Sequence, residues 1–497
     1  MKTLRIWMIV LVCMTACNPL ANTTPVPFVP STLNDELAPY RSALIPASQS
    51  DVDSLDRATR YDLTLTYDAV KYTLAGAQDV LYFNQEIVPL NEIYFRLFAS
   101  YPDSGGMIAI NRLAVDGAAA TATYEAQNTA LKIPLARPLP PNGSTRIRLE
   151  FTLKIPPISK GHYADYGFSN TVVTLPSVLP LIPVYDDKGW HIAIPPRFGD
   201  LVYADISLYA VTMTVPSKMN VIASGSTLDA RDNGDGTTTW RIVAGPMRDF
   251  DINLSDQLQR SSTTIGETTI HSYYEAADAQ AGQDALKIAA DAFREFQNRF
   301  GAYPYRELDI VETPTTAGGI EYPGVIVVGR ELYSNPSQRD FFEFATVHEV
   351  SHQWWYAMVG NDQVNFPWVD EALAQYSTLM YAEAIRGKAN AQQVLKNYFQ
   401  NLYDRAKTAG RDAAVNQPVA AFDENDYGAI VYGKGPLFYD AIRKKMGDEK
   451  FYQFLRTYFA AFRYKIAYPE DILKTAESTC TCSLQDEYKQ WILSPAK

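Results

Sequence analysis

Two of the five histidines in this chain lie four residues apart, in the string His348-Glu349-Val350-Ser351-His352. The residues on either side, from Phe341 to Met358, are compatible with a helix. In a helix, side chains at positions i and i+4 lie on one face, about one turn apart. The string therefore predicts a helix over 341–358 that presents two imidazoles side by side.

Imidazoles at this spacing can bind one zinc ion. Two ring nitrogens one turn apart can reach Zn²⁺ at about 2.0–2.1 Å, but two protein ligands do not suffice. Glu371 is the predicted third ligand, because it follows His352 with 18 residues between them and lies where Pro367 opens another helix. Two histidines, one glutamate and a water form the catalytic type of zinc site. Glu349 lies beside these ligands, where it can act as a general base.

Composition limits the class of protein and the number of domains that can carry this site. A chain of 497 residues, 47% of them hydrophobic, is long enough for two or three packed domains. Its net charge of −12 argues against a nucleic acid partner, because an acidic surface repels phosphate. Composition therefore favours a multidomain globular protein without nucleic acid.

The chain changes character near its middle, which predicts an α+β protein with two domains. Residues 37–260 contain alternating runs such as Tyr61–Tyr67 and Leu208–Val215, with turn signals at Asn233-Gly234 and Asp235-Gly236, and predict an antiparallel β domain. Residues 261–497 begin with helical spacing from Gln280 to Phe300 and continue as a mainly helical domain with two short strands.

The first residues are typical of export. Lys2 and Arg5 precede a short apolar run and then Thr15-Ala16-Cys17, so residues 1–16 are predicted to be a signal peptide. The ending resembles the lipobox of bacterial lipoproteins, which implies cleavage before Cys17 and lipid on its thiol. An ordinary secretory signal is the alternative. Residues 17–36 are rich in proline and predict a flexible tether, so we expect an extracytoplasmic protein held to a cell membrane.

Several motifs together resemble the gluzincin zinc aminopeptidases, a family that includes aminopeptidase N and leukotriene A hydrolase. The resemblance rests on the histidine motif with Glu371, on Gln353-Trp354-Trp355, and on the upstream strings Phe300 to Tyr305 and Gly318 to Gly324. It implies a saddle-like or sandwich-like β domain followed by a thermolysin-like, mainly helical catalytic domain with one zinc ion per chain.

The same resemblance implies roles for residues outside the zinc motif. Gly318-Gly319-Ile320-Glu321 matches the family segment that binds the substrate, in which the glutamate binds the free α-amine of a peptide. Tyr432, in Tyr432-Gly433-Lys434-Gly435, matches the tyrosine that donates to the oxyanion. Tyr427 is the weaker candidate for that role.

Some family features have no clear counterpart. Neither Gln375 nor Thr378 offers the acidic partner that a zinc-bound histidine often has. Asp186 and Asp187 are candidates, by location only, for a second amine-binding acid from the β domain. Cys480 and Cys482 enclose one residue, and a local disulfide is favoured over metal binding.

The function predicted from the sequence is a zinc-dependent aminopeptidase that removes residues from the N-termini of peptides. A zinc endopeptidase and a non-catalytic peptide-binding surface lipoprotein are the alternatives. Because about 126 residues follow Glu371, the sequence also predicts a catalytic domain without a further helical domain, and a cleft that stays open on one side.

Overall fold

Long strands with one buried face build the first half of the chain. In β1 (Thr59–Asp68), which contains the predicted strand Tyr61–Tyr67, buried residues alternate with exposed or half-buried ones. Such alternation is typical of a strand that covers a core on one side and meets solvent on the other. The predicted hairpin turn at 233–236 joins β15 (Ser226–Asp232) to β16 (Thr237–Met247).

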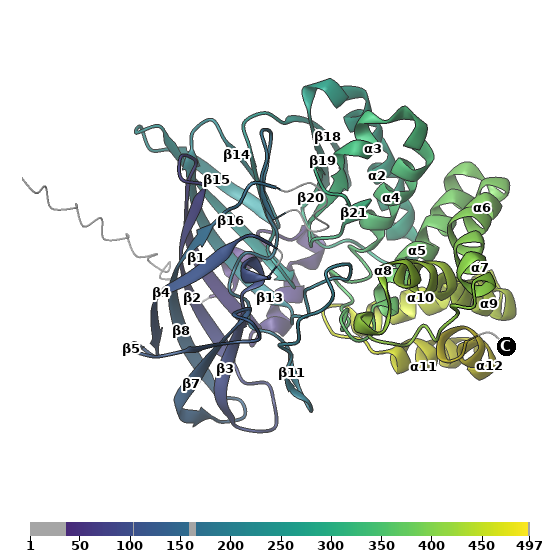
Figure 1. Ribbon diagram of the computed structural model, residues 1–497, viewed down its shortest axis with the longest axis horizontal. Coiled ribbons are helices and arrows are strands. Elements are labelled where there is room, and N and C mark those ends of the chain that lie inside the picture. The colour runs from purple at the N-terminus through teal and green to yellow at the C-terminus, as the bar shows by residue number, and fades with distance from the viewer. Residues whose placement is uncertain (1–35, 103, 159–165, 496–497) are drawn as a thin grey trace, which may run out of the picture. The chain divides into compact units, whose positions relative to one another are not determined.

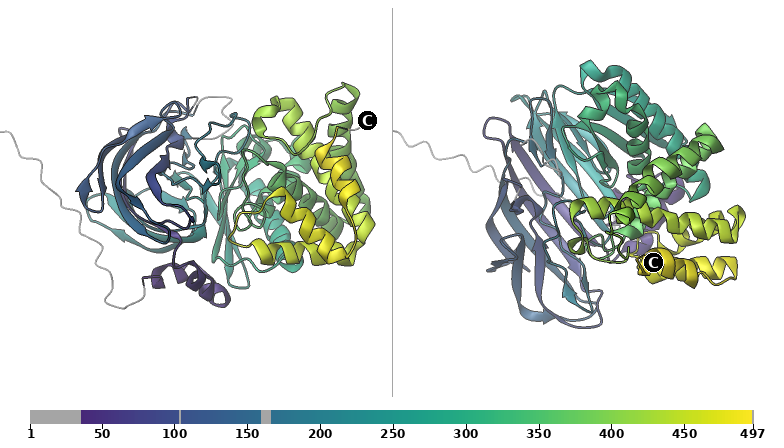
Figure 2. Two further views of the ribbon diagram at one scale, coloured as in Figure 1. Left: turned by 90° about the horizontal axis from the view of Figure 1, so that it is seen from below. Right: turned by 45° about the vertical axis from the view of Figure 1, so that its right-hand side comes forward.

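The computed structural model describes residues 36–102, 104–158 and 166–495. The predicted signal peptide, Cys17 and the tether up to residue 35 lie outside the described residues. Residues 37–497 form one compact unit, in which strands dominate the first half and helices the second (Figures 1 and 2). In the described part of the chain, no helix is long and apolar enough to cross a membrane.

The first half contains four sheets, whose strands pair mainly antiparallel, with a parallel pair between β1 and β13. The largest sheet has the order β15-β16-β13-β1-β2-β8-β4-β5 and is completed by β13 (Ser207–Pro216), β2 (Thr73–Phe83), β8 (Ser144–Lys154), β4 (Met107–Val115) and β5 (Ala118–Ala119). The smaller sheets comprise β3 (Leu90–Arg96), β7 (Ala130–Leu139) and β6 (Thr123–Glu125); β14 (Asn220–Ala223), β17 (Ile252–Ser255), β10 (Val173–Leu175) and β9 (Gly167–Phe168); and β11 (Tyr185–Asp186) with β12 (Gly189–Trp190).

A fifth sheet belongs to the second half. Its order is β18-β19-β20-β22-β21, which leaves the short strand β21 (Gly319–Ile320) at one edge. The other strands are β18 (Gln259–Ile265), β19 (Thr268–Tyr274), β20 (Glu307–Thr313) and β22 (Val325–Gly329). The predicted domain boundary at 260/261 therefore falls inside β18.

Helices complete the second half. The long helix α2 (Ala279–Arg299) matches the predicted helical spacing from Gln280 to Phe300 and packs against α4 (Arg339–Ser351). The others are α3 (Arg330–Ser334), α5 (Trp368–Tyr381), α6 (Lys388–Val394), α7 (Asn401–Thr408), α8 (Glu424–Tyr427), α9 (Gly435–Met446), α10 (Asp448–Phe462), α11 (Pro469–Cys480) and α12 (Gln485–Tyr488), with π-helical turns η5 (Ala382–Arg386), η6 (Leu395–Gln400), η8 (Gly428–Lys434) and η9 (Lys489–Leu493).

The helix that carries the histidine motif is shorter than the sequence predicts. We expected it to continue to Met358, but α4 ends at Ser351, and His352 is its C-cap. The chain then turns back on itself, with Tyr356 at a positive φ of 124° and the Val359 amide donating to the Trp354 carbonyl at 3.0 Å. Continuous helix over 341–358 was therefore a wrong prediction, because contacts from elsewhere hold the turn after His352.

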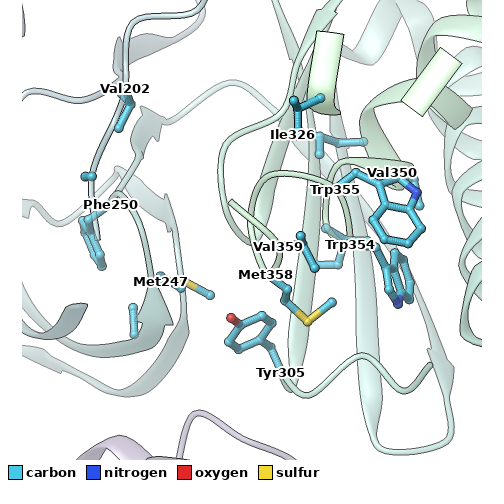
Figure 3. Packing of buried hydrophobic residues seen from close by; sticks show 14 of the residues in the cluster. Val202, Met247, Phe250, Tyr305, Ile326, Val350, Trp354, Trp355, Met358 and Val359 are labelled. Atoms are coloured by element: carbon cyan, nitrogen blue, oxygen red, sulfur yellow. The ribbon is translucent and has the colours of Figure 1, made fainter. Parts of the chain in front are cut away.

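Two buried tryptophans pack that turn against the rest of the helical half (Figure 3). Trp354 and Trp355 are at most 1% exposed, and both indole N–H groups are satisfied. Trp354 donates to the Gly301 carbonyl at 2.9 Å, and Trp355 donates to the Ser377 hydroxyl at 3.1 Å. Buried aromatic side chains whose polar edge finds a partner fix both position and orientation.

The apolar core continues from the first half into the second without a break. Figure 3 shows the side chain of Tyr305 between Met247 of the β half and Met358 of the helical half. The Tyr305 hydroxyl donates to the Pro246 carbonyl, a second link between the halves. Because burial of apolar surface is the main favourable term in folding, the shared core stabilises the contact between the halves.

Arg248 joins the halves through its guanidinium. This β-half residue is 2% exposed and donates to the carbonyls of Tyr356 at 3.0 Å and Met358 at 3.4 Å, both in the turn after His352. It also donates to the carbonyls of Ala204 and Lys465. One side chain thus binds four carbonyls; those of Met358 and Lys465 also accept the backbone amides of Tyr464 and Gly360.

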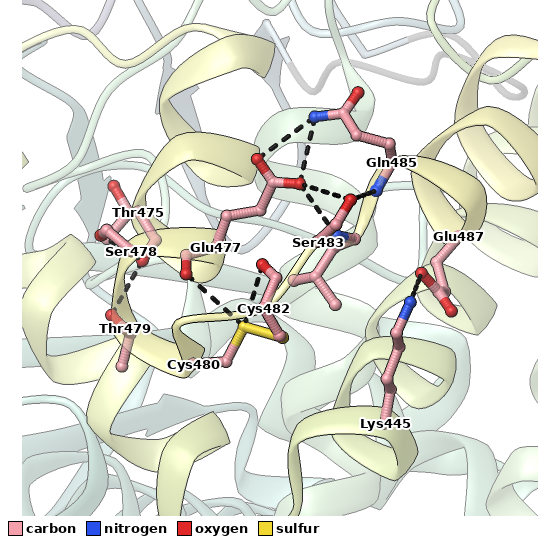
Figure 4. Close-up of a disulfide and its surroundings, with 11 residues drawn as sticks. Lys445, Thr475, Glu477, Ser478, Thr479, Cys480, Cys482, Ser483, Gln485 and Glu487 are labelled. Atoms are coloured by element: carbon pink, nitrogen blue, oxygen red, sulfur yellow. Dashed lines mark hydrogen bonds and ion pairs between the residues drawn. A yellow bond between two sulfur atoms is a disulfide. The ribbon is translucent and has the colours of Figure 1, made fainter.

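A disulfide closes the end of α11 (Figure 4). Cys480 and Cys482 are bonded, as the sequence favoured, with Thr481 between them as the left-handed C-cap. Around it, Glu477 accepts hydrogen bonds from the Leu484 amide and the Gln485 side chain. The pair is a local connection in the helical half.

We expect Arg248→Met to lower the free energy of unfolding by about 3 kcal/mol, because several buried carbonyls lose their donor. Arg241→Met is the matched control: Arg241 is half exposed and pairs with Asp229 at the surface, so its loss is expected to cost less than about 1 kcal/mol. Denaturant unfolding of the two variants tests this, and equal stability would contradict the role given to Arg248.

Candidate metal centre

Both histidines of the motif are buried, and their Nε2 atoms face each other at 3.0 Å. His348 lies in the last turn of α4, and His352 caps the same helix. The Nδ1 atom of His352 lies 2.8 Å from the Trp355 carbonyl, which can only accept a hydrogen bond. This contact makes Nδ1 the donor and leaves the Nε2 lone pair for a metal.

Glu371 brings the third ligand atom to the same point. It lies in the first turn of α5, a helix buried on every side, where the helix dipole favours a carboxylate. Its Oε2 atom is 3.1 Å from His348 Nε2 and 3.4 Å from His352 Nε2. Ligand atoms at about 2.0–2.1 Å from one tetrahedral zinc ion lie about 3.3 Å apart. The three side chains therefore fit zinc in both chemistry and spacing.

The Nδ1 atom of His348 differs from that of His352 in its hydrogen bonding. It is buried and has no hydrogen-bond partner within reach among the described residues. Burial lowers the pKa of this imidazole, and the neighbouring Glu371 carboxylate opposes that effect more than the Gln375 amide does. The structure thus gives His352 a backbone carbonyl as acceptor, whereas His348 Nδ1 has no acceptor among the described residues.

Glu349 occupies the position of a base beside the ligands without being one of them. Its carboxylate lies against the backbone of β21: a Cβ atom at Gly319 would be 2.4 Å from Glu349 Cγ, so only glycine leaves this room. Burial raises the pKa of Glu349 well above its usual range, and the nearby carboxylates of Glu321 and Glu371 raise it further. A carboxylate held this way is suited to accept a proton.

Tyr432 reaches the metal ligands from η8. Its hydroxyl donates to Glu371 Oε1 at 2.5 Å. Two residues later, buried Lys434 donates to Asp412 and to two backbone carbonyls at 2.7–2.8 Å, which anchors this turn. The ring of Tyr427 packs instead against the rings of Phe198, Phe422 and Tyr432. Tyr432 is thus the tyrosine that reaches the ligand set, in the place that the family resemblance implied.

Glu321 follows the edge strand β21 and is 5% exposed. Its Oε1 atom accepts a hydrogen bond from Gln363 at 3.0 Å. The loop after it is held by Gln353, whose side chain donates to the Tyr322 carbonyl at 3.2 Å and accepts from the Gly324 amide at 2.8 Å. This gives Gln353, which follows the second histidine in sequence, a structural role at the site.

A residue that we did not predict completes the carboxylate group. Asp200 precedes β13 in the β half, and its carboxylate lies within 4.8 Å of those of Glu321 and Glu371. Burial, followed by repulsion from Glu321 and Glu371, raises its pKa well above the usual value. The candidates chosen by location do not reach this group: Asp186 pairs with His191 at 2.8 Å, and Asp187 is exposed.

Two cavities meet at these carboxylates. A cavity of about 520 Å³ and another of about 340 Å³ both have Asp200 and Glu321 in their walls. The smaller one also contains the predicted catalytic residues and the glycines of β21, namely His348, Glu349, Glu371, Tyr432, Gly318 and Gly319. Both volumes are in the range of sites that enclose small ligands.

Similarity to known proteins agrees with this geometry. Residues 284–491 match the model of the Peptidase family M1 domain. Aminopeptidase M1-B of Oryza sativa subsp. japonica is 22% identical over 302 residues, 57% of this chain and 34% of that protein. Aminopeptidase N of Streptomyces lividans is 22% identical over 57% of this chain and 35% of its own length. The matched part thus spans about a third of these relatives.

The fold has solved counterparts over most of its length. An M1 zinc metallopeptidase from Deinococcus radiodurans aligns with a TM-score of 0.63 and 20% identity, covering 88% of this chain and 94% of that one. A substituted form of that enzyme, bound to a Tyr-Ser-Ala substrate, aligns equally well at 19% identity. Residues 284–491 therefore resemble the M1 peptidase domain, and the chain as a whole shares the fold of these M1 metallopeptidases.

We expect Glu349→Gln to keep its zinc, because the base is separate from the ligands, whereas His352→Ala and Glu371→Ala lose it. Metal analysis of the three purified variants measures this directly. A zinc-free Glu349→Gln protein of normal stability would contradict the assignment of ligands and base.

Proposed function

We propose that this chain is a zinc-dependent aminopeptidase that removes the first residue of a peptide. The observation that carries the proposal is the pairing of Glu321 with Asp200 beside Glu371. Carboxylates in a closed site bind an ammonium group through charge-assisted hydrogen bonds. A free α-amine held there brings the first peptide bond next to the metal ligands and the base.

The edge strand supports the same orientation of substrate. β21 pairs on one side with β22, through Gly319 with Val328 and Ile320 with Val327, and is the last strand of its sheet. The open side of an edge strand offers backbone N–H and C=O groups to an extended peptide. A peptide added there is held along its backbone, with its amine at Glu321.

The chemistry then follows from the positions of the side chains. His348, His352 and Glu371 would hold the zinc ion, which would supply Lewis-acid chemistry for the scissile carbonyl and the attacking water. The Glu349 carboxylate takes a proton from that water and passes it to the leaving amine nitrogen. The phenol of Tyr432 donates to the carbonyl oxygen as negative charge develops on it, which favours the transition state over the ground state.

The test of this function is a set of aminoacyl fluorogenic amides, each with a free and with an acetylated amine, assayed with and without a zinc chelator. We expect hydrolysis of the free forms, a loss of at least about a hundredfold on acetylation, and abolition by the chelator. Cleavage within N-acetylated peptides at a similar rate would support the endopeptidase alternative. Bound zinc without any hydrolysis would support the non-catalytic alternative.

We expect Tyr432→Phe to lower kcat on the order of 10²-fold with little change in KM, the pattern of an interaction made mainly in the transition state. Tyr427→Phe is the matched control, five residues earlier in the chain, and is expected to retain most activity. Steady-state kinetics on one aminoacyl amide compares them. A loss in Tyr427→Phe with none in Tyr432→Phe would reverse the assignment.

We also propose that the protein is held at the outer side of a bacterial cell membrane by lipid on Cys17. The support is the order of charged, apolar and small residues over positions 1–17. We expect Cys17→Ser to release the protein from the membrane fraction without loss of catalysis. Continued membrane fractionation of a correctly processed Cys17→Ser protein would contradict the anchor.

A further inference from the structure

The smaller cavity extends from the metal site to the helices η6 and α7. Residues from these elements line the 340 Å³ cavity and are absent from the walls of the larger one; they are Asn397, Tyr398, Leu402 and Arg405. The shared carboxylates Asp200 and Glu321 mark the end where the two cavities meet. Arg405 therefore belongs to the part of the smaller cavity that lies away from the larger one.

The charges of this cavity are distributed unevenly. Its acidic residues are Asp200, Glu321, Glu349 and Glu371. Among the described residues, Arg405 is the one Lys or Arg side chain in its wall. A peptide that is free at both ends has the complementary pattern, with a cationic amine at one end and an anionic carboxylate at the other.

The guanidinium of Arg405 makes no hydrogen bond or ion pair with the described part of the chain. Neighbouring arginines of the helical half differ in this respect. Arg386 pairs with Glu343, Arg411 with Asp426 and Arg443 with Glu383. Arg405 is exposed and lines both this cavity and a shallower hollow along α7, so its donors are available to a ligand, whereas those three arginines serve the fold.

The wall beside Arg405 is aromatic. The rings of Phe344 and Tyr398 stack with centroids 4.0 Å apart, and Phe341 stacks against both. All three line the cavity. This apolar wall leaves the exposed guanidinium as the cationic group at this end of the cavity. It also packs the side chain of a residue that follows the scissile bond.

We propose that Arg405 binds the terminal carboxylate of short peptides, so that the site selects substrates of two or three residues that are free at both ends. This inference rests on the proposed function, because it assumes an amine at Glu321 and Asp200. The fork of donors in arginine matches a carboxylate in a bidentate manner. A cavity of about 340 Å³ is near the small end of the range for ligand sites, which suits a short peptide.

The test compares Leu-Ala-Ala with its C-terminal amide, which has the same residues and lacks the negative charge. For the unmodified protein we expect kcat/KM to be about tenfold higher for the free acid, mainly through KM. In Arg405→Gln the ratio is expected to fall to about one. In Arg405→Lys, which keeps the charge and loses the fork, it is expected to be intermediate.

Lys407→Gln is the matched control, because it removes a cation from the same helix at a position outside the cavity wall. It is expected to keep the ratio of the unmodified protein. A ratio of about one in the unmodified protein, or an unchanged ratio in Arg405→Gln, would overturn the inference. An equal fall in Lys407→Gln would also overturn it, because the effect would then come from the general charge of α7.

Binding separates this inference from the proposed function. Calorimetry on the zinc-loaded Glu349→Gln protein measures the affinity for the same two tripeptides without turnover. A tighter Kd for the free acid that disappears in Glu349→Gln/Arg405→Gln supports the carboxylate site even if no peptide is hydrolysed. Hydrolysis of aminoacyl amides together with equal Kd values for acid and amide would support the proposed function and overturn the role of Arg405.

Discussion

Three ligand atoms from two helices must meet within 3.0–3.4 Å of one another among buried side chains. This requirement fixes much of the second half of the chain. α4 and α5 must pack closely, and α5 must begin where its first turn points Glu371 at the histidines. The turn after His352 must also hold Trp355 where its carbonyl orients the imidazole. This requirement that the ligand atoms meet at one point is consistent with three features of the structure: the buried tryptophans, the all-buried α5 and the anchored turn η8.

The pKa values of the carboxyl groups around the ligands also follow from this close, buried packing. Burial raises the pKa of Asp370 to about 8, with Glu371 and Glu321 adding to the effect, and raises those of Asp200 and Glu349 well above their usual values. So many carboxyl groups in one buried place lack compensating positive charge. The proposed zinc ion and the ammonium of a substrate are the two cations that would balance them. Metal binding and amine recognition therefore both depend on the same group of buried carboxylates.

Local patterns made much of this site predictable. The spacing of His348 and His352 could be read directly, because helix geometry relates sequence distance to spatial distance, and Glu371 was predicted from its place at the start of the next helix. The β half and the helix after Gln280 were likewise predicted from periods of two and 3.6 residues. Asp200 was missed because it lies in the irregular segment 195–200, where no period exists, and it reaches the site through contacts between the two halves. The end of α4 was misjudged for a related reason, because distant Arg248 binds the turn that stops it. The acceptor for His352 is a backbone carbonyl, which every residue has, so no residue type in the sequence could indicate it.

The four carbonyl contacts of Arg248 affect whether the two halves of this protein can be separated or exchanged for those of another protein. Two of them hold the turn that carries Trp355, and Trp355 in turn sets which nitrogen of His352 faces the metal. The β half is thus a structural component of the catalytic apparatus, and the two halves are not interchangeable modules. A chimera that joins this helical half to another β domain needs an arginine at the corresponding position, or the turn beside the metal site loses the two hydrogen bonds that the β half supplies.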